Sequence, residues 1–248
     1  MGGFSKINKM SITWNIEKTA ADLADTLATN VHTQIEKSIA EQGSAVLALS
    51  GGSTPKPFFK ALAAKTLDWS KVVITLVDER WVDESHELSN ALFLRENLLQ
   101  HLSDEVSFVP LYHPALSLEE SFDTVIKTYC ERTGSSVRQP RKLDIVILGM
   151  GGDGHTASFF PDASNIASLV DANDSSFLAT CESPSTQVPR ITWTLNTLLN
   201  TSFLALHFTG CSKRQVFEQA LVAGAHTELP IRSAIFQDMV PLNIYYAD

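Results

Sequence analysis

The amino-acid sequence predicts an α/β protein, a three-layer α/β/α sandwich around a mostly parallel, Rossmann-like sheet, formed by a single domain over residues 1–248. Two observations support this prediction. Short β-branched apolar runs alternate with amphipathic helical segments along the chain, and several of these runs end in glycine-rich or charged turns. Such turns are typical of the carboxyl ends of parallel strands, where open α/β sheets bind their ligands.

The expected strands are the short apolar runs. Strands of a parallel sheet are buried on both faces, so they read as continuous apolar runs without alternating polar residues. In chain order, the expected strands cover residues 11–14, 45–49, 72–77, 107–109, 143–148, 177–181, 203–208 and 243–246.

The expected helices follow from apolar spacing and from start and stop signals. Apolar residues recur every four positions over residues 17–42, and Gly43 ends this helix. Ser53 and Thr54 before Pro55 indicate a capped helix start. Two further helices are expected over residues 56–65 and 214–222. A third carries Leu94 and Leu98, and a fourth runs from a capping box at Ser117 and Glu120 to Gly134. A fifth begins at 189–192, before Leu195.

Composition and charge exclude several classes of protein. The net charge of −9 and the lack of a lysine and arginine cluster argue against a nucleic-acid surface. No apolar run approaches the ~20 residues of a membrane span, and no apolar leader begins the chain, so we expect a soluble, cytoplasmic protein. The three cysteines lie far apart, and neither they nor the histidines show metal-ligand spacing. We therefore expect reduced thiols, no metal, a small-molecule substrate and a monomer.

The strongest candidate site is the stretch Gly149-Met-Gly-Gly-Asp-Gly-His155, which follows a buried apolar run. Its glycines match the dinucleotide-binding fingerprint, and Asp171 follows at roughly the required ~20 residues. That interpretation needs an unbroken crossover helix, which Pro161 interrupts, and would set Asp153 against a pyrophosphate. A tight turn with a hydrogen-bonded histidine is the purely structural alternative. As a ligand loop, the stretch places Asp153 and His155 at the rim of a pocket.

Other expected strand ends carry residues that suit an anion. The turn at 50–55 offers backbone N–H groups, two hydroxyls and a helix N-terminus, which together form a phosphate cradle. Arg190 and Lys213 are cations at expected helix starts. Each feature has a structural alternative: a capped helix, an ion pair between Asp78 and Arg80, or a surface arginine. The candidates are Gly51, Gly52, Ser53, Thr54, Asp78, Arg80, Arg190 and Lys213.

Five motifs, taken together and in order, resemble the 6-phosphogluconolactonases of the glucosamine-6-phosphate deaminase/6-phosphogluconolactonase superfamily. They are Leu49-Ser-Gly-Gly-Ser-Thr-Pro55, Val77-Asp-Glu-Arg-Trp81, Gly149-Met-Gly-Gly-Asp-Gly-His-Thr-Ala-Ser158, Pro189-Arg-Ile-Thr192 and Gly210-x-x-Lys213. The resemblance covers nearly the whole chain, and although each motif alone is weak, five in sequence are specific.

Two other classes of protein resemble this sequence in part. The deaminases of the superfamily are similar up to His155 but continue with Asn-Glu-Pro, whose glutamate helps to open the sugar ring. Here Phe160 precedes Pro161, and a phenyl ring cannot relay protons. Sugar-phosphate sensor domains have a related fold and bind without turnover. They carry a DNA-binding segment ahead of the sensor, for which we expect no room before Trp14.

The resemblance implies hydrolysis of 6-phospho-D-glucono-1,5-lactone to 6-phosphogluconate, the second step of the oxidative pentose phosphate pathway, without a cofactor. His155 would be the general base and then the acid, because histidine titrates near neutral pH. Asp153 would either orient the imidazole or bind sugar hydroxyls. Loop chemistry suggests the N–H groups of Gly151 and Gly152 as oxyanion donors.

The resemblance also implies how the sugar phosphate is held. Ser53, Thr54, Arg190 and Lys213 would bind the 6-phosphate. Asp78 and Arg80 would lie at the rim, with Arg80 a candidate third phosphate contact. A covalent mechanism through Ser158 is not expected, because no second base is placed beside it.

Overall fold

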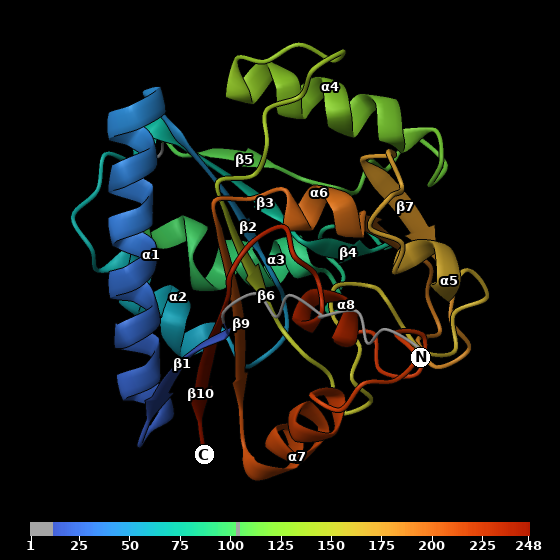
Figure 1. The fold of residues 1–248 in the computed structure, drawn as a ribbon. Coiled ribbons are helices and arrows are strands. Elements are labelled where there is room, and N and C mark those ends of the chain that lie inside the picture. The colour runs from blue at the N-terminus through green and yellow to red at the C-terminus, as the bar shows by residue number, and fades with distance from the viewer. Residues whose placement is uncertain (1–11, 103–104) are drawn as a thin grey trace, which may run out of the picture.

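A seven-stranded parallel sheet forms the centre of the molecule (Figure 1). The structure, a computed structural model, describes residues 12–102 and 105–248. Residues 1–11, which include the first residue of the expected strand at 11–14 and the stretch searched for a leader, lie outside this part. In spatial order the strands are β1 (Ile12–Glu17), β10 (Leu242–Ala247), β9 (Phe203–Thr209), β6 (Ile145–Leu148), β2 (Ala45–Leu49), β3 (Val72–Leu76) and β5 (Ser107–Val109).

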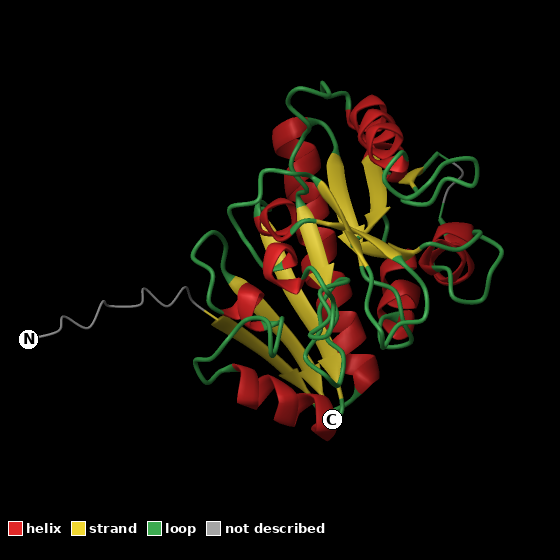
Figure 2. Ribbon diagram, turned by 90° about the vertical axis from the view of Figure 1, so that its right-hand side faces the viewer, coloured by secondary structure: helices red, strands yellow, loops and turns green. Residues whose placement is uncertain are grey.

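Helices cover both faces of this sheet, as Figures 1 and 2 show. On one face lie α1 (Ala20–Gln42) and α2 (Lys56–Ala63), which pack against each other. On the other lie α6 (Leu195–Leu199), α7 (Cys211–Ala220) and α8 (Arg232–Ile235). The predicted three-layer α/β/α arrangement is therefore confirmed. The remaining helices are α3 (Asn90–Asn97), α4 (Ser121–Thr133), α5 (Ile166–Leu169), η1 (Trp69–Lys71) and η2 (Leu99–His101).

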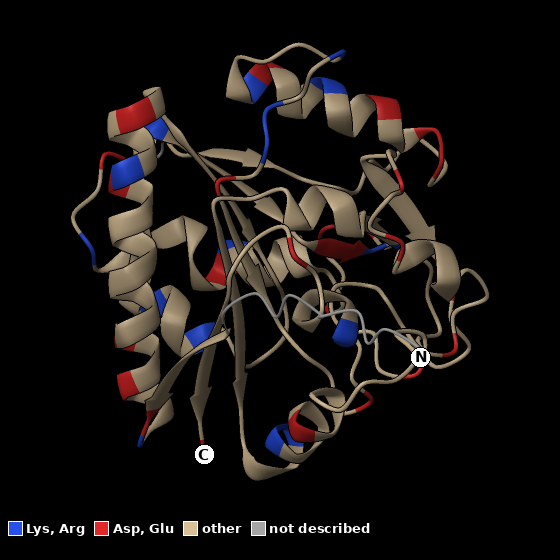
Figure 3. Ribbon diagram, viewed as in Figure 1, with Lys and Arg blue, Asp and Glu red and all other residues tan. Residues whose placement is uncertain are grey.

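The core is apolar because the central strands are buried on both faces. Every residue of β2 and β3 is buried, and α1, whose buried stripe begins with Leu23 and Leu27, packs against β2. Figure 3 shows charged residues mainly on helices and loops, with an acidic and basic cluster at β4 (Asp78–Arg80). No helix in the described part of the chain is long and apolar enough to cross a membrane.

A second, antiparallel sheet of three strands corrects one prediction. It consists of β4, β8 (Arg190–Trp193) and β7 (Leu178–Cys181), in the order β4-β8-β7. The expected helix start at 189–192 is wrong, because these residues pair with β4 and β7, and the helix begins only after Thr194. Arg190 therefore lies in a strand, opposite Arg80.

Two predicted helix starts also differ in detail. Pro55 is the N-cap residue of α2 and no side chain caps this helix, so the expected cap by Ser53 or Thr54 is wrong. Helix α7 begins at Cys211, which places Lys213 inside its first turn. The expected ends of the long helices at Gly43 and Gly134 are confirmed, both in left-handed backbone.

Candidate active site

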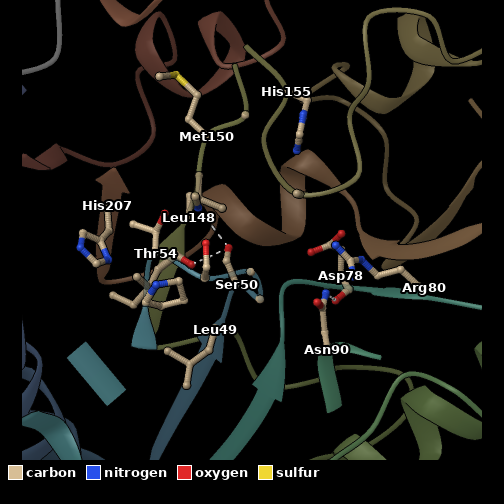
Figure 4. A pocket seen from close by; sticks show the side chains of 18 of the residues that line it. Leu49, Ser50, Thr54, Asp78, Arg80, Asn90, Leu148, Met150, His155 and His207 are labelled. Carbon is tan, nitrogen blue, oxygen red and sulfur yellow. Dashed lines mark hydrogen bonds between the residues drawn. The ribbon is translucent and has the colours of Figure 1, made fainter. Parts of the chain in front are cut away.

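A cavity of about 260 Å³ opens at the carboxyl ends of the central strands (Figure 4). It lies where the loops after β2, β3, β6 and β9 meet, because parallel strands end at one edge of the sheet. The predicted residues that line it are Gly51, Gly52, Ser53, Thr54, Asp78, Arg80, Gly151, His155, Arg190 and Lys213. The structure thus gathers segments far apart in the sequence around one space.

Asp153 lies behind His155 rather than on the cavity wall. Its Oδ1 atom is 2.6 Å from Nδ1 of the imidazole and also accepts the His155 backbone N–H at 3.1 Å. Burial acts to raise the pKa of the Asp153 carboxyl, but the hydrogen bonds and charge of His155 outweigh it and hold this pKa below its usual value. The carboxylate is therefore ionised at neutral pH and fixes one nitrogen of the ring.

Gly151 permits this arrangement by having no side chain. A Cβ atom there would lie 2.2 Å from Nδ1 and Cε1 of His155 and 2.7 Å from Oδ1 of Asp153. The Gly151 N–H donates to the carbonyl oxygen of His155 at 2.9 Å, so this amide is engaged within the loop. The expectation that Gly151 offers a free oxyanion donor is therefore wrong, and Gly152 is not among the residues that line the cavity.

Phe160 connects the histidine loop with Arg190. Its buried ring lies 4.2 Å from the His155 ring, centroid to centroid, at an interplanar angle of 30°. The Cζ atom of Arg190 is 4.8 Å from the centroid of the same Phe160 ring. One aromatic side chain therefore packs against both the imidazole and the guanidinium.

Asp78 lies at the centre of the charged part of the cavity. Its Oδ2 atom accepts the hydroxyl of Ser158 at 2.6 Å and lies 3.7 Å from Nη1 of Arg190. Burial lowers the pKa of the Arg190 guanidinium, Asp78 opposes this effect, and the neighbouring Arg80 adds to it. Because Asp78 contacts Ser158, the expectation that no second base lies beside Ser158 is wrong, but Ser158 is fully buried and does not line the cavity, so its hydroxyl does not face the space where a substrate would bind.

Asn90 is a cavity residue that the sequence did not reveal. Its side chain donates to the carbonyl oxygen of Asp78 at 2.9 Å and packs so closely on Gly51 that a Cβ there would lie 2.0 Å from Asn90 Oδ1. The fully buried Glu79 carboxylate accepts the backbone N–H groups of Asn90 and Ala91, each at 2.7 Å. Strand β4 therefore fixes the start of α3, and with it the Asn90 amide.

Ser50 ties the loop after β2 to the loop after β6. Its hydroxyl donates to the carbonyl oxygen of Ile147 at 2.9 Å and accepts the N–H of Gly149 at 3.1 Å (Figure 4).

Two more side chains line the cavity: His207 near the end of β9, and Lys213 in the first turn of α7. Burial lowers the pKa of the Lys213 ammonium. His207 was not predicted, because a lone histidine in an apolar strand resembles core.

The dinucleotide alternative does not fit the chain after β6. The glycine-rich loop leads through turns into α5, a helix of four residues, and then into β7 of the small sheet, so no crossover helix begins there. Within residues 12–102 and 105–248, no three histidine, cysteine, aspartate or glutamate side chains group as metal ligands would.

The fold and the site define an α/β enzyme, with a polar cavity at the carboxyl edge of a parallel sheet and a histidine–aspartate pair on its central loop. The chain belongs to the family described as glucosamine-6-phosphate isomerases/6-phosphogluconolactonase, whose model matches residues 18–240.

Similar proteins include several named 6-phosphogluconolactonase. The protein of that name from Mesorhizobium japonicum is 40% identical over 245 residues, covering 98% of each chain. That of Rhizobium meliloti is 39% identical and covers 96% of this chain and 100% of its own. The crystal structure of a 6-phosphogluconolactonase from Shewanella baltica superposes with a TM-score of 0.88 at 31% identity, covering 96% of this chain and 98% of that one.

Proposed function

We propose that this chain hydrolyses 6-phospho-D-glucono-1,5-lactone to 6-phosphogluconate, with His155 activating the attacking water. One observation carries the proposal. The His155 imidazole, whose Nδ1 lies 2.6 Å from Oδ1 of Asp153, lines the same cavity as the Ser53 turn and Lys213. One ligand can occupy such a cavity with its ester carbon near His155 and its phosphate near the Ser53 turn and Lys213. The relatives at 39% and 40% identity carry the name of this activity.

The reaction needs one residue that takes and returns a proton. With Nδ1 donating to Asp153, the other ring nitrogen of His155 is the acceptor that removes a proton from water as its oxygen bonds to C1. The tetrahedral intermediate then breaks its bond to the ring oxygen, and the imidazolium returns the proton to that oxygen. The product is the open-chain acid, with no covalent enzyme intermediate.

The other residues bind and orient the substrate in this proposal. Asp153 holds the imidazole in its productive tautomer, since it contacts the ring and does not line the cavity. Ser53 and Thr54, together with Arg190 and Lys213, bind the 6-phosphate. Asp78 and Asn90, which also line the cavity, contact the sugar hydroxyls. Arg80, at the rim of the same cavity, contacts either the sugar or, as a third cation, the phosphate.

A coupled assay with freshly prepared lactone, corrected for spontaneous hydrolysis, tests the activity. We expect rapid formation of 6-phosphogluconate and no ammonia from glucosamine 6-phosphate. Binding of sugar phosphates without turnover would instead favour a sensor, and ammonia release would favour a deaminase. Phe160 argues against the deaminase, because its buried ring packs on His155 where an acid would be needed.

We further infer that the chain is one domain and works as a cytoplasmic monomer in the pentose phosphate pathway. Pairing of β1 with β10 joins both ends of the described chain in one sheet, which supports a single domain. Light scattering coupled to gel filtration measures the oligomeric state, and a mass of twice 27.2 kDa would contradict the monomer.

A further inference from the structure

His207 is a buried polar side chain with no role in the mechanism above. It is 4% exposed, lies near the carboxyl end of β9 and lines the cavity. Within the described part of the chain, no hydrogen bond joins its ring nitrogens to another residue, and these nitrogens are open to the cavity rather than sealed inside the protein. Because polar groups in protein interiors are usually hydrogen-bonded, the ring is available to a partner that enters the cavity. A ligand there can provide one.

The position of His207 identifies which end of a ligand it would meet. Strands β9 and β3 are separated by β6 and β2, a span of three strand spacings or roughly 14 Å. His207 and Lys213 therefore approach from one end of the cavity, and Asp78 and Arg80 from the other. Figure 4 shows His207 on one side of the cavity, with Asp78 and Arg80 on the other.

Two features near His207 suit an anion. Its ring packs edge-on against Phe58, in the first turn of α2, with the two centroids 6.2 Å apart. It thus flanks the N-terminus of α2, which follows the Ser53–Thr54 turn and carries the positive end of the helix dipole. Lys213, close enough to influence the titration of His207, lines the same end of the cavity.

A neutral imidazole is suited to this position. Burial, helped by the charge of Lys213, lowers the pKa of His207 to about 4. The ring is therefore neutral at pH 7, with one N–H donor and one acceptor nitrogen. It can donate a hydrogen bond to a phosphate oxygen without placing a second buried positive charge beside Lys213.

We propose that His207 is a phosphate-binding residue, whose ring N–H donates to an oxygen of the same phosphate that Lys213 binds. The inference rests on the proposed function in assigning that phosphate to a hexose-derived substrate. It adds a residue to the phosphate site that Lys213 and the Ser53–Thr54 turn form in the proposed function.

Two substitutions and one product test this assignment. His207→Leu removes the N–H, and His207→Gln keeps an N–H donor on a side chain of similar reach. Calorimetry with 6-phosphogluconate should show affinity about tenfold or more weaker for H207L, as expected for a hydrogen bond to a charged group, and mostly retained for H207Q. In the lactonase assay, H207L should raise KM while kcat stays within about threefold.

Controls separate a phosphate contact from a structural effect. Gluconate, which lacks the phosphate, should bind the parent and H207L equally, and His226→Leu, a half-buried histidine outside the cavity, should bind 6-phosphogluconate like the parent. Unchanged 6-phosphogluconate affinity in folded H207L would overturn the assignment. So would an equal loss for gluconate, because the contact would then not be with the phosphate.

The calorimetric measurement of 6-phosphogluconate binding does not depend on turnover, so it decides the role of His207 even if the parent protein fails to hydrolyse the lactone. Should H207L not fold, nitrogen NMR of the parent with labelled histidine replaces it. Adding 6-phosphogluconate should shift a ring nitrogen of His207. An unchanged resonance at saturating product would overturn the proposal, as would failure of the parent to bind either 6-phosphogluconate or inorganic phosphate.

Discussion

Replacing Asp153 with asparagine distinguishes the two roles that the sequence left open for this residue. The carboxylate accepts from the imidazole, whereas an asparagine can turn its amide N–H toward Nδ1 and make that nitrogen an acceptor. The proton would then sit on the nitrogen that should receive it from water. The substitution changes no volume, so the loop geometry should be kept while the tautomer reverses.

The structure sets the expected size of the effect. A hydrogen bond to a charged group contributes about 1.5–3 kcal/mol. Because the side chains of His155 and Asp153 are 30% and 44% exposed, the lower end of that range applies, which is about a tenfold loss. The unfavourable tautomer adds to this, so kcat should fall by about tenfold to a hundredfold. KM should change little, since Asp153 does not line the cavity.

Steady-state lactonase kinetics on purified D153N measure both constants. Asp171→Asn is the matched control, because Asp171 is an exposed aspartate outside the cavity and its substitution should leave both constants unchanged. A D153N variant with the parent kcat and a clearly raised KM would refute the orienting role. That result would assign Asp153 to the sugar hydroxyls.

Four further substitutions or conditions test the site. His155→Ala should lower kcat by about 10²–10⁴ with little change in KM, and full retention of kcat in the coupled assay would remove its role as base. Gly151→Ala introduces a methyl group 2.2 Å from the His155 ring, so kcat should fall at least about tenfold in a protein whose circular dichroism is unchanged; parent-like turnover would contradict this. Lys213→Ala should raise KM for the phosphorylated lactone about tenfold but leave hydrolysis of glucono-δ-lactone unaffected, and an equal effect on both substrates would argue against phosphate binding. Finally, the pKa of His207 is about 4 in the folded state against about 6.5 unfolded, so the unfolded state binds more protons between these pH values. The free energy of unfolding should fall by up to about 3 kcal/mol from this group as pH drops from 7 to 4, a loss that urea titrations of His207→Leu should lack; parallel pH profiles would be inconsistent with it.

The large sheet could be predicted because its signal is local. Runs such as β2 and β6 are short, apolar throughout and rich in β-branched residues, as expected of strands buried on both faces, and the turn residues that follow mark where each ends. Strand β8 could not be predicted in this way. Arg190-Ile-Thr-Trp193 is strand because it pairs with β4 more than a hundred residues earlier, a contact with no local trace.

The residues of the candidate site also divide into those with a local sequence signal and those placed by contacts between distant segments. Residues in glycine-rich turns after strands were predicted, because parallel strands bring their carboxyl ends to one edge and hence bring His155 close to the Ser53 turn. Asn90 was missed because its position depends on the buried Glu79 carboxylate, which holds the first backbone N–H groups of α3. The engagement of the Gly151 amide was missed as well, since only the folded loop shows where that N–H points.

Hydrogen bonds between loops fix the relative positions of the proposed phosphate-binding turn, Ser53–Thr54, and the proposed base, His155. The Ser53–Thr54 turn and the loop that carries His155 follow adjacent strands, β2 and β6. The Ser50 hydroxyl bonds to both the end of β6 and the start of the loop that carries His155, so the two loops are joined to each other. A substrate gripped by its phosphate would then present its ester carbon at a fixed distance from the imidazole, which lowers the entropic cost of reaching the attacking geometry.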